Sequence, residues 1–155
     1  MKLLNLGAGN RVMSSHEGRA VVNHDLHAHR PEINAAWDLN VLPWPWQDEE
    51  FDAICAWAVL EHLHIDLLQS VNECWRILKP HGTLTIKLPY WNSEASYEDP
   101  THYWTFAPGV FDAFDPTTKR GAAYSFYTER KWKLLESGFT DRYCTSISAK
   151  LEKLT

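Results

Sequence analysis

The sequence predicts an α/β fold built on a mostly parallel sheet. Short apolar segments of strand composition alternate with crossover segments along the chain, which is typical of parallel sheets. The first apolar segment ends abruptly in Gly7-Ala8-Gly9-Asn10, and a second one ends in Asp25. A buried strand that runs into a glycine turn makes room for a nucleotide-like ligand at the carboxyl edge of a sheet, and the acid can accept hydrogen bonds from both hydroxyls of a ribose. These observations together predict an adenosine site.

The first two strands are expected over residues 3–6 and 20–23. Roughly a dozen residues separate them, close to the minimum for a parallel crossover, so the first helix should be very short or absent. A third short strand is expected over residues 33–37. The loop over residues 38–46 contains two prolines, which prevent regular pairing there.

The middle of the chain carries the clearest helix signal. A fourth strand over residues 51–56 precedes it. Leu67, Val71 and later apolar residues recur at helical spacing within residues 65–78, and Lys79-Pro80-His81-Gly82 stops the run. One face of this helix should pack on the sheet.

The last part of the chain is expected to complete the sheet. A central strand over residues 83–88 ends at Pro89-Tyr90, on the edge where the site should lie. Two further helices are expected over residues 108–114 and 129–137. A final strand or hairpin should lie between residues 139 and 151.

The composition suits one compact domain spanning residues 1–155, because 45% of the residues are apolar and 13% are aromatic. A formal net charge of −5 argues against nucleic acid as the main partner, since proteins that hold a phosphate backbone present broad basic faces. No run approaches the roughly 20 apolar residues that cross a bilayer. Met1-Lys2 leads directly into the first strand rather than into a signal peptide. We therefore expect a soluble, cytoplasmic protein without a membrane partner.

Neither a metal site nor a disulfide framework is predicted. His24, His27 and His29 surround Asp25 but lack a clear further ligand. The three cysteines are widely spaced, which fits a reducing compartment.

Several short motifs occur together in one order. They are Asn5-Leu6-Gly7-Ala8-Gly9-Asn10, Asp25, Leu42-Pro43-Trp44-Pro45-Trp46-Gln47-Asp48, Phe51-Asp52-Ala53-Ile54, Val59-Leu60-Glu61-His62-Leu63 and Arg76-Ile77-Leu78-Lys79-Pro80-His81-Gly82. In these motifs the chain resembles class I S-adenosylmethionine-dependent methyltransferases, most closely their small type 11 branch. Asp99-Pro100-Thr101-His102 is similar to a segment that follows the fifth strand in some members. The resemblance implies a Rossmann-like three-layer α/β/α sandwich with truncated early helices, lacking the N-terminal helices of many relatives, and S-adenosylmethionine as the cofactor.

The resemblance also implies which residues bind the cofactor. It places the methionine part against the glycine turn, where glycine lets the backbone approach a ligand without a Cβ clash. It places the ribose against Asp25, since one carboxylate can accept from two hydroxyls at once. Asn5 stands where the family commonly has an acid and Arg11 where it has a third glycine, so Asn10 and Glu61 are the candidates to compensate. The implied cofactor-binding residues are Asn5, Gly7, Ala8, Gly9, Asn10, Asp25, Leu26, Asp38, Leu39, Ala56, Trp57 and Glu61.

On the acceptor side, methyl transfer needs mainly alignment of the reacting groups. A hydroxyl acceptor also needs a base, for which His102 is the first candidate and Glu61, His62 and Asp99 follow. Each of them has a structural alternative, as a helix start, a backbone-bonded loop histidine or a turn residue. Aromatic side chains near the expected mouth can form a pocket for a planar or sugar acceptor, or simply pack. The candidate substrate-binding residues are His62, Tyr90, Trp91, His102 and Trp104.

Three functions fit these observations. The first is an S-adenosylmethionine-dependent methyltransferase with a small-molecule or glycan-like acceptor, because the acidic charge disfavours polyanionic substrates. The second is a non-catalytic or partner-dependent S-adenosylmethionine-binding protein. The third is an NAD-dependent oxidoreductase, which is disfavoured because Gly7-Ala8-Gly9 lacks the further glycine of the dinucleotide fingerprint. The aromatic excess makes a homodimer a candidate assembly.

Overall fold

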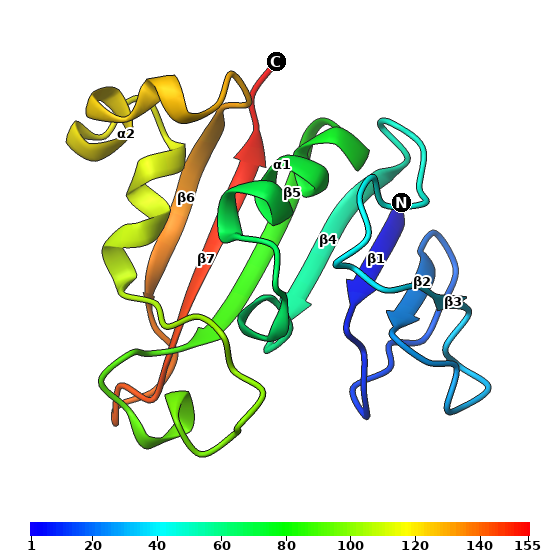
Figure 1. The fold of residues 1–155 in the computed structure, drawn as a ribbon. Helices are drawn as coiled ribbons and strands as arrows, with labels where there is room; N and C mark the ends of the chain where they lie inside the picture. The colour runs from blue at the N-terminus through cyan, green and yellow to red at the C-terminus, as the bar shows by residue number, and fades with distance from the viewer.

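A seven-stranded sheet with the strand order β3-β2-β1-β4-β5-β7-β6 forms the centre of the molecule (Figure 1). The computed structural model describes residues 1–155. Neighbouring strands from β3 to β5 are parallel, and β7 and β6 add an antiparallel hairpin. The predicted mostly parallel, Rossmann-like sheet is therefore confirmed. The strands are β1 (Lys2–Leu6), β2 (Ala20–Asp25), β3 (Ala35–Ala36), β4 (Phe51–Trp57), β5 (Leu78–Pro89), β6 (Trp132–Phe139) and β7 (Ser146–Lys153).

Helices are few and short. The longest, α1 (Leu67–Ile77), confirms the clearest helix prediction. It begins where the Asp66 side chain accepts from the backbone N–H of Gln69 and the Gln69 side chain accepts from the backbone N–H of Asp66, a capping box. No helix joins β1 to β2 or β2 to β3, so the early helices are truncated as expected. The others are η1 (Leu60–His62), η2 (Glu94–Ser96), η3 (Pro108–Phe114), α2 (Lys119–Ala123) and η4 (Ser125–Tyr127).

The prediction of a helix over residues 129–137 is wrong, because most of this segment belongs to the edge strand β6. Trp132 is fully buried at its start, and the backbone pairs antiparallel with β7. This pairing depends on residues 8 to 21 positions further along the chain, so hydrogen bonding within the sheet overrides the local helical pattern.

Three other elements differ in detail from their predictions. The segment expected as a helix over residues 108–114 is the 3-10 helix η3, and the expected third strand shrinks to β3. The helix stop at residues 79–82 lies inside the span of β5. Phe51 pairs with Leu78 and Ala53 already pairs with Thr83, so these four residues bulge out of the ladder between the two pairs.

The hydrophobic core lies on one face of the sheet. Leu4, Ile54 and Leu84 lie in register on neighbouring strands and are fully buried. The buried side of α1 packs against the same cluster, and Figure 1 shows α1 lying across this face. Side chains alternate between faces along a strand, and on the opposite face the paired Thr85 and Lys150 are only half-buried.

The parallel order brings the carboxyl ends of β1 to β5 to one edge, the lower edge in Figure 1. Strand order reverses direction between β1 and β4, and ligands of open α/β sheets bind in the crevice at such a point. None of the helices combines the length and the apolarity that spanning a membrane requires.

Candidate functional site

The glycine turn after β1 adopts a backbone that favours glycine. Gly7 and Gly9 have φ values of 57° and 50°, in the left-handed region. A Cβ atom built on Gly7 would lie 2.5 Å from Cγ2 of Val59, so a side chain there would collide with the second residue after β4. The backbone N–H of Ala8 donates to the carbonyl of His24 at 2.8 Å, which ties the turn to β2.

Asp25 lies at the carboxyl end of β2 and is held by two backbone donors. Its Oδ2 accepts from the N–H of Gly9 at 2.7 Å, and its Oδ1 accepts from the N–H of Leu26 at 2.7 Å. A carboxylate has about four lone-pair positions, so each oxygen can accept one more hydrogen bond. Asp25 is therefore fixed beside the glycine turn with one acceptor position free on each oxygen.

His24 is a buried residue of the site whose position sequence reasoning missed. Its Nδ1 accepts from the N–H of Gly7 at 3.4 Å, and its Nε2 lies 2.9 Å from the carbonyl of Trp37, which can only accept. Burial lowers the pKa of His24. The neutral ring joins the glycine turn to the loop after β3, and no local pattern in the sequence signals this bridge.

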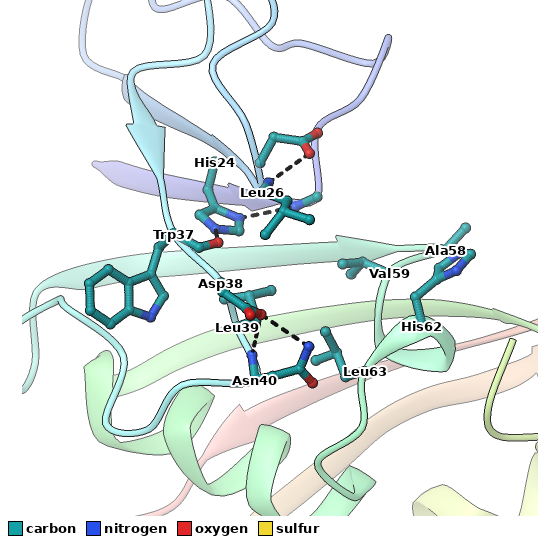
Figure 2. A pocket seen from close by; sticks show the side chains of 12 residues that line it. His24, Leu26, Trp37, Asp38, Leu39, Asn40, Ala58, Val59, His62 and Leu63 are labelled. Atoms are coloured by element: carbon teal, nitrogen blue, oxygen red, sulfur yellow. Dashed lines mark hydrogen bonds between the residues drawn. The ribbon is translucent and has the colours of Figure 1, made fainter. Parts of the chain in front are cut away.

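These segments enclose a cavity of about 300 Å³ at the carboxyl edge of the sheet (Figure 2). Figure 2 shows Leu26, Leu39 and Val59 around it as apolar walls. Asp38 also lines it, and its Oδ1 accepts from the backbone N–H and from Nδ2 of Asn40, at 2.9 and 3.0 Å. Both contacts use one oxygen, so Oδ2 can accept from a ligand.

Other residues expected at the cofactor lie close to this cavity but do not line it. Ala8, Gly9 and Asn10 complete the turn. Beyond β4 the wall is formed by Ala58 and Val59, one to two residues after the expected Ala56 and Trp57. Ala56 is buried in the core.

Asn5 serves the loop after the turn. Its Nδ2 donates to the carbonyl of Arg11 at 2.9 Å and to Oδ1 of Asn23 at 3.0 Å. The backbone N–H of Met13 donates to the same oxygen of Asn23 at 2.9 Å. An amide at position 5 can donate these bonds, whereas an ionised acid there could not.

A second cavity, of about 350 Å³, adjoins the first, and Ala58 and His62 line both. It contains all the residues proposed from the sequence as acid–base candidates, namely Glu61, His62, Asp99 and His102. The ligand-capable atoms of Glu61, His62 and His102 lie within 4.8 Å of one another. The structure therefore brings together residues that are some forty positions apart in the chain.

Backbone hydrogen bonds hold the two segments together. The N–H of Tyr103 donates to the carbonyl of Glu61 at 2.8 Å. This bond places His102 beside His62, with ring centroids 4.6 Å apart. The Glu61 side chain is fully buried, and neither carboxylate oxygen has a hydrogen-bond partner. Burial raises the pKa of Glu61 to about 7, although the charge of His102 acts to lower it.

Asp99 and His62 are linked through a hydroxyl. Thr101 donates through its backbone N–H at 2.8 Å and its Oγ1 at 2.7 Å to Oδ1 of Asp99, and these bonds lower the pKa of Asp99. Nδ1 of His62 lies 2.8 Å from the same Thr101 hydroxyl. Burial and the neighbouring charge of His102 lower the pKa of His62.

The aromatic candidates lie outside both cavities. Tyr90 packs against Phe139 with ring centroids 4.9 Å apart, and Trp91 is exposed. Trp104 lines a separate apolar cavity of about 320 Å³, and its Nε1 donates to the carbonyl of Leu63 at 2.8 Å.

The amino-acid sequence matches the family model for a methyltransferase domain of type 11 over residues 11–86. The matched segment makes up just under half of the chain and carries the pattern of the type 11 methyltransferases. The matched segment contains Asp25, Asp38 and Glu61-His62, which line the two cavities. No curated protein matches the methyltransferase significantly.

Solved structures support the same fold. A SAM-dependent methyltransferase from Archaeoglobus fulgidus aligns with a TM-score of 0.63 at 15% identity, over 98% of this chain and 86% of that one. One from Aquifex aeolicus aligns with a TM-score of 0.61 at 14% identity, over 100% and 82%. A protein described as a methyltransferase, in complex with the Trm112 methyltransferase activator of Haloferax volcanii, gives 0.68 at 15% identity, over 99% and 83%. At these identities the likeness establishes the Rossmann-like fold alone.

S-adenosylmethionine is the cofactor of this methyltransferase, and the residues of the first cavity fit it. The free acceptor positions of Asp25 suit two ribose hydroxyls. The apolar walls suit a flat adenine ring, and Oδ2 of Asp38 can accept from its amino group. The left-handed turn at Gly7 presents bare backbone to the same space.

Proposed function

We propose that this methyltransferase transfers a methyl group from S-adenosylmethionine to a small-molecule or glycan-like acceptor bound in the second cavity. The observation that carries the proposal is the shared boundary of the two cavities at Ala58 and His62. A donor held by Asp25 and the glycine turn and an acceptor held beside Glu61 would meet at this boundary. Holding two reactants in line is the main contribution that a protein makes to such a transfer.

When bound, S-adenosylmethionine supplies a methyl group attached to a positively charged sulfur, and this sulfur is the leaving group, released as a neutral thioether. Asp25 orients the ribose, and the cavity walls at Leu26 and Leu39 exclude water from the adenine. On the other side, Ala58 and His62 fix how closely the acceptor approaches. These residues position the reactants and need not change their own bonding.

A hydroxyl acceptor must also lose its proton as the new C–O bond forms. His102, Glu61 and Asp99 are the proposed catalytic residues, because they line the cavity where this proton is released. The imidazole of His102 would receive this proton. With an amine acceptor, the proton would be removed from the ammonium product after the new C–N bond has formed.

The size and polarity of the second cavity support a small acceptor. About 350 Å³ holds a drug-sized molecule or a sugar unit, while a folded macromolecule could insert only a side chain or a terminal unit. Arg11 and Lys87 line it together with three acids, which suits a polar ligand with several hydrogen-bonding groups.

Calorimetric titration with S-adenosylmethionine, S-adenosylhomocysteine and NAD tests the cofactor assignment. We expect micromolar binding of the first two and none of NAD. Turnover is then measured as S-adenosylhomocysteine released with a panel of small hydroxyl compounds, amines and free sugars, with an oligonucleotide as the control acceptor. Binding of NAD alone, or turnover with the oligonucleotide alone, would contradict the proposal.

A partner-dependent binding protein is the second candidate function. One structural neighbour is in complex with the Trm112 methyltransferase activator, so methyltransferases of this fold can work with a protein partner. In the present chain the connections around the first cavity, between β1, β2 and β3, contain no helix. Cofactor binding without turnover on any acceptor would favour this second function.

A further inference from the structure

We propose that Glu61, His62 and His102 form a binding site for a divalent transition-metal ion, with zinc as the probe. Their ligand-capable atoms lie within 4.8 Å of one another, which allows all three to contact one ion. Two imidazoles and one carboxylate form a donor set that binds Zn²⁺ or Fe²⁺ and leaves coordination positions open. The residues considered as ligands from the sequence, His24, His27 and His29, are different ones.

The buried carboxylate of Glu61 is the first observation behind the proposal. The side chain is 0% exposed, and both oxygens lack a hydrogen-bond partner. A buried polar group without a partner destabilises the folded protein, and it does so more strongly if it is charged. Glu61 lines the second cavity beside two imidazoles, so a cation held there would supply the partner that the protein does not.

The hydrogen bonds of the two histidines are the second observation. The Thr101 hydroxyl donates to the carboxylate of Asp99, so it must accept from Nδ1–H of His62. Nδ1 of His102 lies 3.2 Å from the carbonyl of Ser96, which also can only accept. Both rings therefore carry their proton on Nδ1, and Nε2 keeps its lone pair.

Metal-binding histidines show this arrangement in general, because a partner on one ring nitrogen fixes the tautomer and the ring orientation for the other. The path from Asp99 through Thr101 to His62 supplies a negative charge behind one ligand. The carbonyl of Ser96 supplies the partner behind the other. Both anchors lie in the connection between β5 and η3, with Ser96 at the end of η2 and Thr101 in the turn that follows.

The charges around the cavity are mixed. Glu98 and Asp99 add to the negative charge of Glu61, while Arg11 and Lys87 oppose it. A bound ion would leave the positive side chains to face an anionic or strongly polar acceptor. This arrangement fits an ion that keeps an open position toward the cavity.

The role of the ion in catalysis rests on the proposed function, whereas its binding does not. An acceptor oxygen on the open position would release its proton to solvent more readily, because a metal ion lowers the pKa of a bound hydroxyl. The oxygen would then take the methyl group, and the sulfur would leave as a thioether. In this state His102 is a ligand and no longer the base.

Zinc titration of the full chain tests the site without cofactor or acceptor. After treatment with a chelator and its removal, Zn²⁺ binding is measured by calorimetry, and Co²⁺ binding by its visible absorption. We expect a single ion per chain in the wild type. Glu61→Gln and His102→Ala should each weaken binding by roughly 100-fold, since losing a ligand should cost at least as much as losing an outer partner.

His16→Ala is the matched control, because His16 is exposed and lines neither cavity. It should bind zinc as the wild type does. Circular dichroism checks that each variant is folded, and His62→Gln replaces any variant that is not. Absence of zinc and cobalt binding by the wild type, or equal binding by all variants, would overturn the metal site and leave the methyltransferase proposal standing. If the protein binds zinc but not S-adenosylmethionine, the metal site stands and the methyltransferase proposal is overturned.

Discussion

The backbone N–H of Gly9 donates a 2.7 Å hydrogen bond to Oδ2 of Asp25. This bond joins the glycine turn after β1 to the acid at the end of β2, the two features from which the ligand site was predicted. The acid that would hold the ribose thus also fixes the turn that would face the methionine part. A change at either residue should disturb both ends of the cofactor site.

Asp25→Ala should lower the affinity for S-adenosylmethionine by roughly 10- to 100-fold, because hydrogen bonds to a charged group contribute about 1.5–3 kcal/mol. Calorimetry measures the change. Glu32→Ala removes an exposed carboxylate from the loop between β2 and β3 and should bind as the wild type does. Equal affinities of the two variants would show that the ribose lies elsewhere.

Gly7→Ala should destabilise the fold by about 1–3 kcal/mol, since a Cβ there meets Val59 at 2.5 Å and φ is 57°. Urea denaturation gives the free energy of unfolding. Gly138→Ala in β6 is the control, because a Cβ at that position meets no atom within 4 Å. If both variants were equally stable, the turn could not be under steric constraint.

Asp115 should make the stability of the fold depend on pH in the acidic range. Burial alone would raise the pKa of its carboxyl. Hydrogen bonds from Thr117 and Leu134 and the charge of Lys133 outweigh this effect, so the pKa lies below its ordinary value. A lowered pKa stabilises the fold at a pH above the unfolded value of about 3.9, and this contribution is lost as the pH falls through the folded value.

Asp115→Asn should therefore be less stable than the wild type at pH 7, by about 1–3 kcal/mol. The difference should shrink as the pH falls below about 4. Denaturation curves at neutral and acidic pH measure it. A constant difference at all pH values would mean that the ionised form of Asp115 contributes nothing.

Thr101 is a positioning residue, because it acts on the metal site through His62. Thr101→Val should weaken zinc binding by roughly 10- to 100-fold. Thr101→Ser keeps the hydroxyl and should bind zinc with nearly wild-type affinity. If Thr101 acted only through the packing of its methyl group, Thr101→Ser would also bind zinc weakly. The exposed Thr105→Val is the control. Wild-type affinity in Thr101→Val would refute the link from Asp99 to His62.

Much of the fold could be predicted because its signals are local. Residues 3–6 and 51–56 have strand composition, and the helix from Leu67 to Ile77 has apolar spacing. The short first crossover leaves room for at most a very short early helix. The strand β6 could not be predicted in this way. Its edge position depends on pairing with β7 and on the burial of Trp132, neither of which is visible in its own residues.

The sequence by itself determined the parallel sheet, the glycine turn and the acid at the end of β2, because strand composition, φ preference and strand spacing are properties of short segments. Only the tertiary structure decided that His24 bridges Gly7 to Trp37. It also decided that Glu61 and His102 share one cavity. Both depend on contacts between distant segments, such as the bond from Tyr103 to the carbonyl of Glu61, and chain folding alone creates them.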